Sequence, residues 1–131
     1  METVISPSIL SADFANLEHE ILRVKNAGAK WVHVNVMDGH FVPNITIGAP
    51  VVKSLRKVTD LKLDVHLMIS EPDNYIQDFI EAGSDIITFH YEAQTNQTLD
   101  IIKKIKAHNV LAGLSIKQNT PTDVLKDFIP Y

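Results

Sequence analysis

Short apolar segments alternate with amphipathic segments along the whole 131-residue chain. Five segments are rich in Val, Ile and Leu and predict β-strands, at residues 4–10, 31–37, 62–69, 85–91 and 111–116. The segments between them have helical periodicity, at residues 14–27, 50–58, 70–82 and 97–108, and a further helix is predicted to begin near residue 120. This alternation predicts a parallel sheet with crossover helices.

A weak internal repeat gives the length of one strand–helix unit. The sequence Ala27-Gly28-Ala29 precedes the second predicted strand, and Ala82-Gly83-Ser84 precedes the fourth, 55 positions later (82 − 27). One unit therefore takes about 27 residues, and eight units would need roughly 220, near the usual size of a (β/α)₈ barrel. The chain is either an open α/β sheet complete at five strands or about five units of a TIM barrel.

The faces of the second and third predicted strands favour the barrel. Alternate residues of a strand point to opposite faces, so each of these strands has one face of Val and Leu and another that is polar or titratable. The second face carries His33, Asn35, Met37, Asp64, His66 and Met68. An open doubly wound sheet is covered by helices on both faces, whereas polar side chains on one face are typical of a barrel interior near its catalytic end.

Two histidines are candidate metal ligands. His33 and His66 occupy matching positions on neighbouring parallel strands, so that their imidazoles can converge on one metal ion. The alternative is that each is a hydrogen-bonded interior histidine. His90, at the end of the fourth predicted strand, either lines the same mouth or makes a structural hydrogen bond.

Three further residues are candidates for substrate contacts. Ser8, at the end of the first predicted strand, can hydrogen-bond a substrate oxygen, or it caps the helix that follows. Met37 and Met68 lie on the polar face of their strands, where they either fill gaps in the core or form an apolar floor that restricts water.

Composition narrows the classes of function. The formal net charge is −4, so nothing favours nucleic acid or an anionic membrane as partner, and the absence of cysteine excludes disulfides and zinc–thiolate sites. The N-terminus lacks a basic region followed by a long apolar run, and no stretch approaches the roughly 18 apolar residues of a membrane span. We expect a single-domain, soluble, cytoplasmic protein.

Four segments carry a family resemblance: SPSILSADFANL, VHVNVMDGHFVPNITIG, LDVHLMI and GSDIITFHYEA. In their order and spacing they resemble the ribulose-phosphate 3-epimerase family, and the MDGHFVPN stretch is specific to it. The resemblance covers essentially the whole chain. It implies a (β/α)₈ barrel and the metal-assisted interconversion of D-ribulose 5-phosphate and D-xylulose 5-phosphate by inversion at C3, in the pentose phosphate pathway.

The resemblance also implies the roles of single residues. The family uses a divalent metal (Zn, Fe, Mn or Co) held by two His and two Asp, and those Asp exchange the C3 proton. By position, His33 and His66 would be metal ligands, Ser8 and His66 would contact the pentulose 5-phosphate, and Met37 and Met68 would flank the reacting centre.

The sequence departs from the family pattern in two ways. Asn35 stands where the family motif HVDVMDG has an acid/base and ligand Asp, and an amide brings no charge and is no base near neutral pH. The strands that supply the opposing Asp and the phosphate-binding loops are not among these 131 residues. We therefore expect an impaired or inactive chain. The alternatives are a non-catalytic, truncated or degenerate half-barrel and a relative of hexulose 6-phosphate 3-epimerase.

Unpaired sheet edges predict homo-oligomers.

Overall fold

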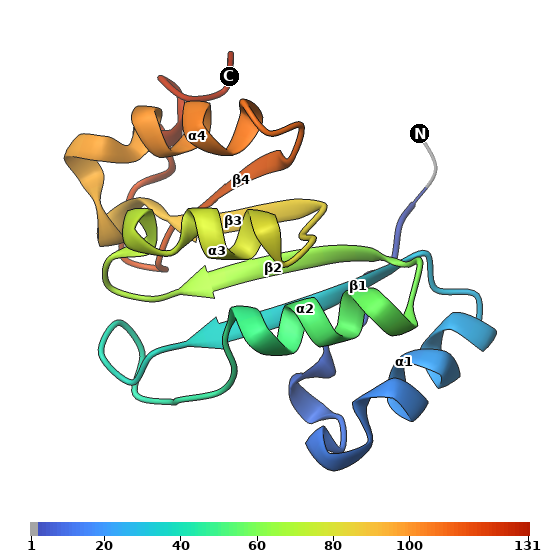
Figure 1. Ribbon diagram of the computed structural model, residues 1–131. Helices are drawn as coiled ribbons and strands as arrows, with labels where there is room; N and C mark the ends of the chain where they lie inside the picture. The colour runs from blue at the N-terminus through green and yellow to red at the C-terminus, as the bar shows by residue number, and fades with distance from the viewer. Residues whose placement is uncertain (1–2) are drawn as a thin grey trace.

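A parallel four-stranded sheet forms the centre of the computed structural model, which describes residues 3–131. Its strands are β1 (Trp31–Met37), β2 (Lys62–Met68), β3 (Ile86–His90) and β4 (Leu111–Ser115). They lie side by side in chain order, each parallel to the next (Figure 1). The predicted parallel α/β fold is confirmed, and four of the five predicted strands are present.

One α-helix precedes β1, α1 (Leu17–Asn26), and three lie in the crossover connections, α2 (Ala49–Val58), α3 (Ile76–Glu81) and α4 (Thr98–Lys106). Each carries apolar residues at helical spacing that are buried against the sheet. Short 3₁₀ turns precede or follow them, at Ile9–Ser11, Phe14–Asn16, Pro72–Asn74, Tyr91–Ala93 and Thr95–Gln97. The last predicted helix is only a 3₁₀ turn, Thr122–Leu125. No helix within residues 3–131 is long and apolar enough to cross a membrane.

The hydrophobic core lies between the helices and one face of the sheet. Alternate residues of β1 and β2 are buried there, and β3 adds an aromatic ring to the same layer. These side chains are Val32, Val34, Val36, Leu63, Val65, Leu67, Ile87 and Phe89. The faces predicted from the sequence are therefore the observed ones, and burying this apolar layer leaves the polar side chains of the strands on the opposite face.

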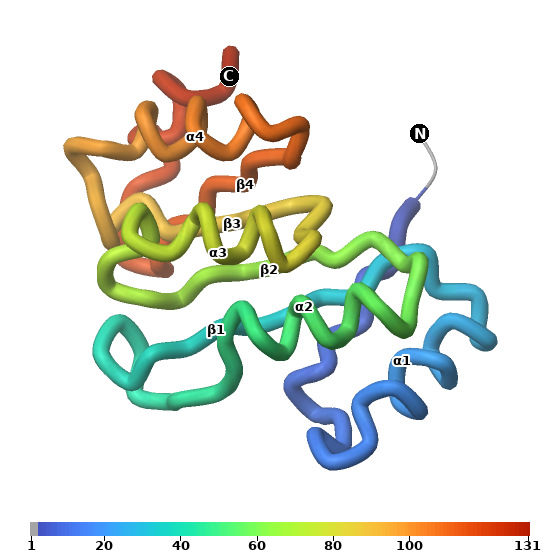
Figure 2. The backbone as a smooth tube through the Cα atoms, viewed as in Figure 1, coloured from blue at the N-terminus to red at the C-terminus, as the bar shows by residue number. Residues whose placement is uncertain are grey.

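The first predicted strand, residues 4–10, is not a strand, and this prediction was wrong. The segment passes beside the start of β1 (Figure 2) and makes a single bridge, Ser8 with His33, in which the His33 N–H donates to the Pro7 carbonyl over 2.8 Å. Proline has no N–H to continue a ladder, and the chain turns into the 3₁₀ turn directly after Ser8. The bridge still holds Ser8 at the edge of β1.

The close approach of β3 and β4 depends on a glycine. Gly113 is the register partner of Thr88, and a Cβ atom at position 113 would clash with the Thr88 side chain. Position 113, on the polar side of the sheet, therefore requires a residue without a side chain. β3 and β4 keep their register up to the pair formed by His90 and Ser115.

Candidate active site

The pairing of β1 with β2 builds one end of the polar face. His33 is the register partner of Asp64, and its Nδ1 atom lies 2.7 Å from Asp64 Oδ2, which also accepts from the Ser6 hydroxyl over 3.3 Å. The hydrogen bond that His33 makes to the Asp64 carboxylate raises the pKa of His33, and burial of the ring opposes the shift in part. The carboxylate therefore orients this imidazole and directs its Nε2 atom away from Asp64.

Asn35 lies next along the same face, opposite His66 in the register. Its amide Nδ2 donates to Ser8 Oγ over 2.6 Å, which leaves the amide oxygen as the acceptor. Ser8 Oγ also accepts from the Leu10 backbone N–H over 3.1 Å and caps the first 3₁₀ turn. Ser8 is therefore both a capping residue and a neighbour of Asn35, so the two alternatives for this serine are compatible.

His66 lies between two other imidazoles. Its ring centroid is 5.5 Å from that of His33 and 5.0 Å from that of His90, with which it stacks at 17°. The Nε2 atoms of His66 and His90 are 2.9 Å apart. Burial, together with the charges that His90 and His33 would carry, lowers the pKa of His66 to about 4, so its ring is neutral at pH 7. A neutral imidazole is the form that binds metals and accepts protons.

The two methionines take neighbouring places at the carboxyl end of β1 and β2. Met37 and Met68 are register partners and both are partly buried. They thus come together with His33, Asn35, His66 and Ser8 on the polar face, as the alternation predicts. Their roles toward a substrate stay predictions.

These side chains supply the nitrogen ligands that a divalent metal site needs, but not its anionic oxygen ligands. His33 is oriented by a carboxylate in the way that metal-binding histidines usually are, and His66 is a neighbouring neutral imidazole. Asn35 adds an uncharged oxygen. Within residues 3–131, no group of three or more His, Asp or Glu side chains is placed to hold a metal ion.

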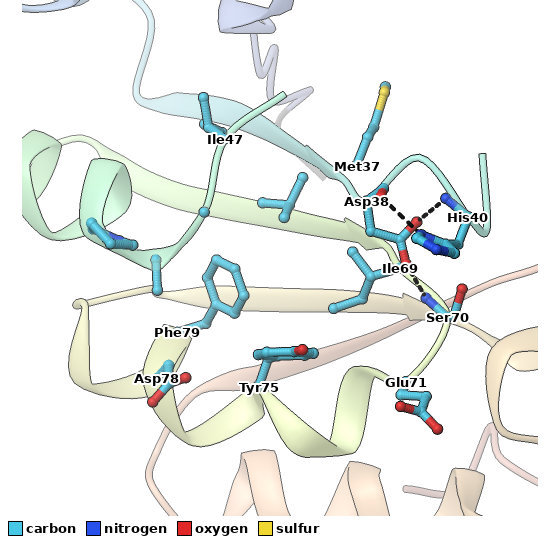
Figure 3. A pocket seen from close by; sticks show the side chains of 14 residues that line it. Met37, Asp38, His40, Ile47, Ile69, Ser70, Glu71, Tyr75, Asp78 and Phe79 are labelled. Atoms are coloured by element: carbon cyan, nitrogen blue, oxygen red, sulfur yellow. Dashed lines mark hydrogen bonds between the residues drawn. The ribbon is translucent and has the colours of Figure 1, made fainter. Parts of the chain in front are cut away.

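Asp38 does not fill the place of the missing carboxylate. It lies beyond β1, where its carboxylate accepts from the backbone N–H groups of His40, Phe41 and Ser70 (2.8 Å each). Burial would raise its pKa, but these hydrogen bonds outweigh burial and lower the pKa of Asp38 to about 2. Two of these hydrogen bonds, to His40 and Ser70, are drawn in Figure 3.

A cavity lies beside Asp38, on the helix side of the strand ends. It has a volume of about 680 Å³ and is lined by Asp38, Tyr75 and Phe79, among others. Figure 3 shows the Met37 side chain pointing away from Tyr75 and Phe79. Met37 lines the cavity but neither His33 nor His66 does, so the cavity reaches the end of the polar face without including its histidines.

Sequence analysis missed the residues that surround His90. Phe41, from the loop after β1, lies with its ring centroid 5.0 Å from that of His90. Lys117 Nζ lies 3.7 Å from the centroid of the Phe41 ring and donates to the Phe41 carbonyl over 3.1 Å. Glu92 accepts from the Lys117 backbone N–H over 2.6 Å. All three belong to loops at the carboxyl ends of strands, where periodicity predicts nothing.

Replacing Asp64 with Asn tests the origin of the charge state of His33. The substitution Asp64→Asn should lower the NMR titration midpoint of His33, which lies above the ordinary 6.5 in the parent chain. Because a raised histidine pKa stabilises the fold below pH 6.5 and loses that effect as pH rises through the raised value, the substitution should destabilise the chain more at pH 6 than at pH 9, by about 1–3 kcal/mol.

The matched control is Asp60→Asn, which removes an exposed carboxylate paired with Lys25. It should leave the His33 midpoint unchanged. An unchanged midpoint in Asp64→Asn as well would show that Asp64 does not set the charge of His33.

Comparisons with known proteins show which family the sequence resembles. The model of the "Ribulose-phosphate 3 epimerase family" matches residues 4–131. The ribulose-phosphate 3-epimerase of Eremothecium gossypii is 49% identical over 142 residues, covering 100% of this chain and 59% of the relative. That of Bacillus subtilis is 52% identical over 124 residues, covering 93% of this chain and 56% of the relative. The chain thus spans less than two thirds of the length of these curated relatives.

Solved structures support the fold alone. A dihydropteroate synthase of Xanthomonas albilineans superposes with a TM-score of 0.58 at 17% identity, over 95% of this chain and 49% of the other. The similarity therefore indicates the same partial α/β barrel architecture without indicating a shared reaction. The match of the family model over nearly all of the sequence shows more: the chain belongs to the ribulose-phosphate 3-epimerase family.

Proposed function

We propose that this chain supplies the N-terminal part of an active site for C3 epimerisation of a pentulose 5-phosphate. The observation that carries the proposal is the gathering of His33, Asn35 and His66 on one face by the β1–β2 register, in a chain of this family. The polar face runs along β1 and β2 to Met37 and Met68 at their carboxyl ends, the end of the strands where TIM-barrel enzymes have their catalytic residues.

The surroundings of each residue favour one role in epimerisation. Epimerisation removes the proton beside a ketone and leaves an enediolate, whose charge must be stabilised where it develops. His33, oriented by Asp64, and the neutral His66 would hold a divalent metal, with the Asn35 oxygen beside them. Such an ion supplies Lewis-acid stabilisation of developing negative charge. Ser8 would hydrogen-bond a substrate oxygen, and Met37 and Met68 would keep water from the reacting carbon.

Asn35 is the residue of this site that fits the reaction least well. Inversion at a planar intermediate requires an acid/base on each face, and an amide accepts no proton near neutral pH. In addition, the amide donates to Ser8, which fixes it in an uncharged hydrogen bond. We therefore propose that the 131-residue chain has little or no turnover by itself, because both proton-transfer groups are missing from it.

A two-by-two comparison tests this function. Asn or Asp at position 35 is placed in the 131-residue chain and in a chimera that continues with the C-terminal part of the Bacillus subtilis relative. Turnover of ribulose 5-phosphate and calorimetric zinc affinity are measured. We expect Asn35→Asp to raise the turnover of the chimera by about 10²–10⁴-fold, the usual contribution of one acid/base group. In the short chain it should tighten zinc binding without restoring turnover.

Asn96→Asp is the matched control, since it adds the same charge at an exposed position away from the polar face. An active short chain with Asn35→Asp would show that the downstream strands are dispensable. A fully active chimera with Asn35 would show that this position is not the missing acid/base. Running the chimera with a hexulose 6-phosphate distinguishes the two sugar classes.

We also propose that the short chain associates with a second copy through β4. This strand pairs only with β3 among the described residues, so its outer edge is open, and Leu111 on it is 62% exposed. Sedimentation at micromolar concentration should show dimers or larger species that Leu111→Lys weakens. A monodisperse monomer with cooperative unfolding would contradict this.

A further inference from the structure

Two buried polar atoms face each other beside the candidate site. Among residues 3–131, the buried side-chain atoms without a hydrogen bond are Nδ1 of His90 and Oε2 of Glu92. They lie 3.5 Å apart. A buried polar atom without a partner costs about 1–3 kcal/mol. A small closing movement would join these two atoms and remove the cost for both.

The carboxylate of Glu92 is held from its other side. Its Oε1 atom accepts from the backbone N–H of Lys117 over 2.6 Å and from the hydroxyl of Thr120. Burial would raise the pKa of Glu92, but these donors outweigh burial and lower it, so that the group is ionised at neutral pH. Glu92 thus presents to His90 an oxygen that can only accept a hydrogen bond.

The fixed carboxylate determines the tautomer of His90. A neutral imidazole has one N–H donor and one acceptor nitrogen, and only the donor is stable against an acceptor oxygen. His90 therefore carries its proton on Nδ1, toward Glu92. Its Nε2 atom is then an acceptor, and this atom points to His66.

The tautomer of His90 in turn determines that of His66. Two nitrogen lone pairs at 2.9 Å would repel each other, so one of the facing Nε2 atoms must carry a hydrogen. Because His90 has its hydrogen on Nδ1, the hydrogen between the rings belongs to His66. The Nδ1 atom of His66 is then the acceptor. The planes of the two histidine rings differ by only 17°, so their Nε2 atoms meet edge to edge, and the Phe41 ring lies against His90 at a tilt of 51°.

We propose that Glu92 is a positioning residue, which acts through His90 to set the nitrogen of His66 that carries the proton. For its catalytic meaning the proposal rests on the proposed function. In that reaction His66 would offer Nδ1 as a lone pair, ready to bind a cation or to accept a hydrogen from a substrate hydroxyl. Removing the charge of Glu92 changes a proton position two side chains away.

The substitution Glu92→Gln should move the proton to the other ring nitrogen in both His90 and His66. Lys117 N–H must still be accepted, so the amide oxygen of Gln takes the place of Oε1 and its NH₂ group faces His90. His90 then accepts at Nδ1 and donates from Nε2, and His66 moves its proton to Nδ1. Two-bond ¹H–¹⁵N spectra of the imidazoles, recorded on the 131-residue chain at neutral pH without metal or substrate, report these positions.

We expect His66 to be protonated on Nε2 in the parent chain and on Nδ1 in Glu92→Gln, with His90 changing in the opposite sense. Glu18→Gln, an exposed charge on α1, should change neither ring. Should Glu92→Gln fail to fold, His90→Phe removes the acceptor, and the Nε2-protonated fraction of His66 should fall.

Either of two results would overturn the proposal: a His66 protonated on Nδ1 in the parent chain, or a proton position that no substitution changes. The spectra require no turnover. An inactive chimera in the kinetic comparison would therefore refute the epimerase function without touching the role of Glu92. An unchanged tautomer of His66 would refute only the role of Glu92.

Discussion

The register between β1 and β2 is the constraint on which the site depends. It sets His33 opposite Asp64 and Asn35 opposite His66. A slip of one residue would exchange the faces of the strand and bury these side chains among Val34, Val65 and their neighbours, at a prohibitive cost in desolvation. The apolar layer beneath the helices therefore fixes the polar constellation above it. The chemistry of the site follows from the packing of the core.

Three imidazoles in a row have pKa values shifted in different directions because their surroundings differ. The hydrogen bond that His33 makes to Asp64 outweighs burial and raises the pKa of His33, whereas burial prevails at His66 and His90 and lowers their pKa values. Keeping His66 neutral stabilises the fold above pH 6.5, and that contribution is lost as the pH falls toward 4. The row thus combines one imidazole whose pKa is raised with two whose pKa values are lowered.

Much of this arrangement can be predicted from the sequence. Alternation of Val with polar residues predicted β1, β2 and the shared face, because one side of each strand must be buried. The first predicted strand failed because alternation ignores Pro7 and the turn that begins at Ser8. Asp64 lay on the predicted face, but its pairing with His33 depends on side-chain conformation. Glu92 lies in a 3₁₀ turn, and its partners come from a distant loop, for which local sequence carries no signal.

We propose that a divalent cation binds at the polar face of β1 and β2, and not in the carboxylate-lined cavity beside Asp38. Adding Mn²⁺ in small steps to the ¹⁵N-labelled 131-residue chain tests this directly, because the ion broadens the signals of nearby nuclei. We expect broadening centred on His33, Asn35 and His66, and its reversal by Zn²⁺. Broadening centred on Asp38 and Asp78, or spread evenly over the surface, would contradict it.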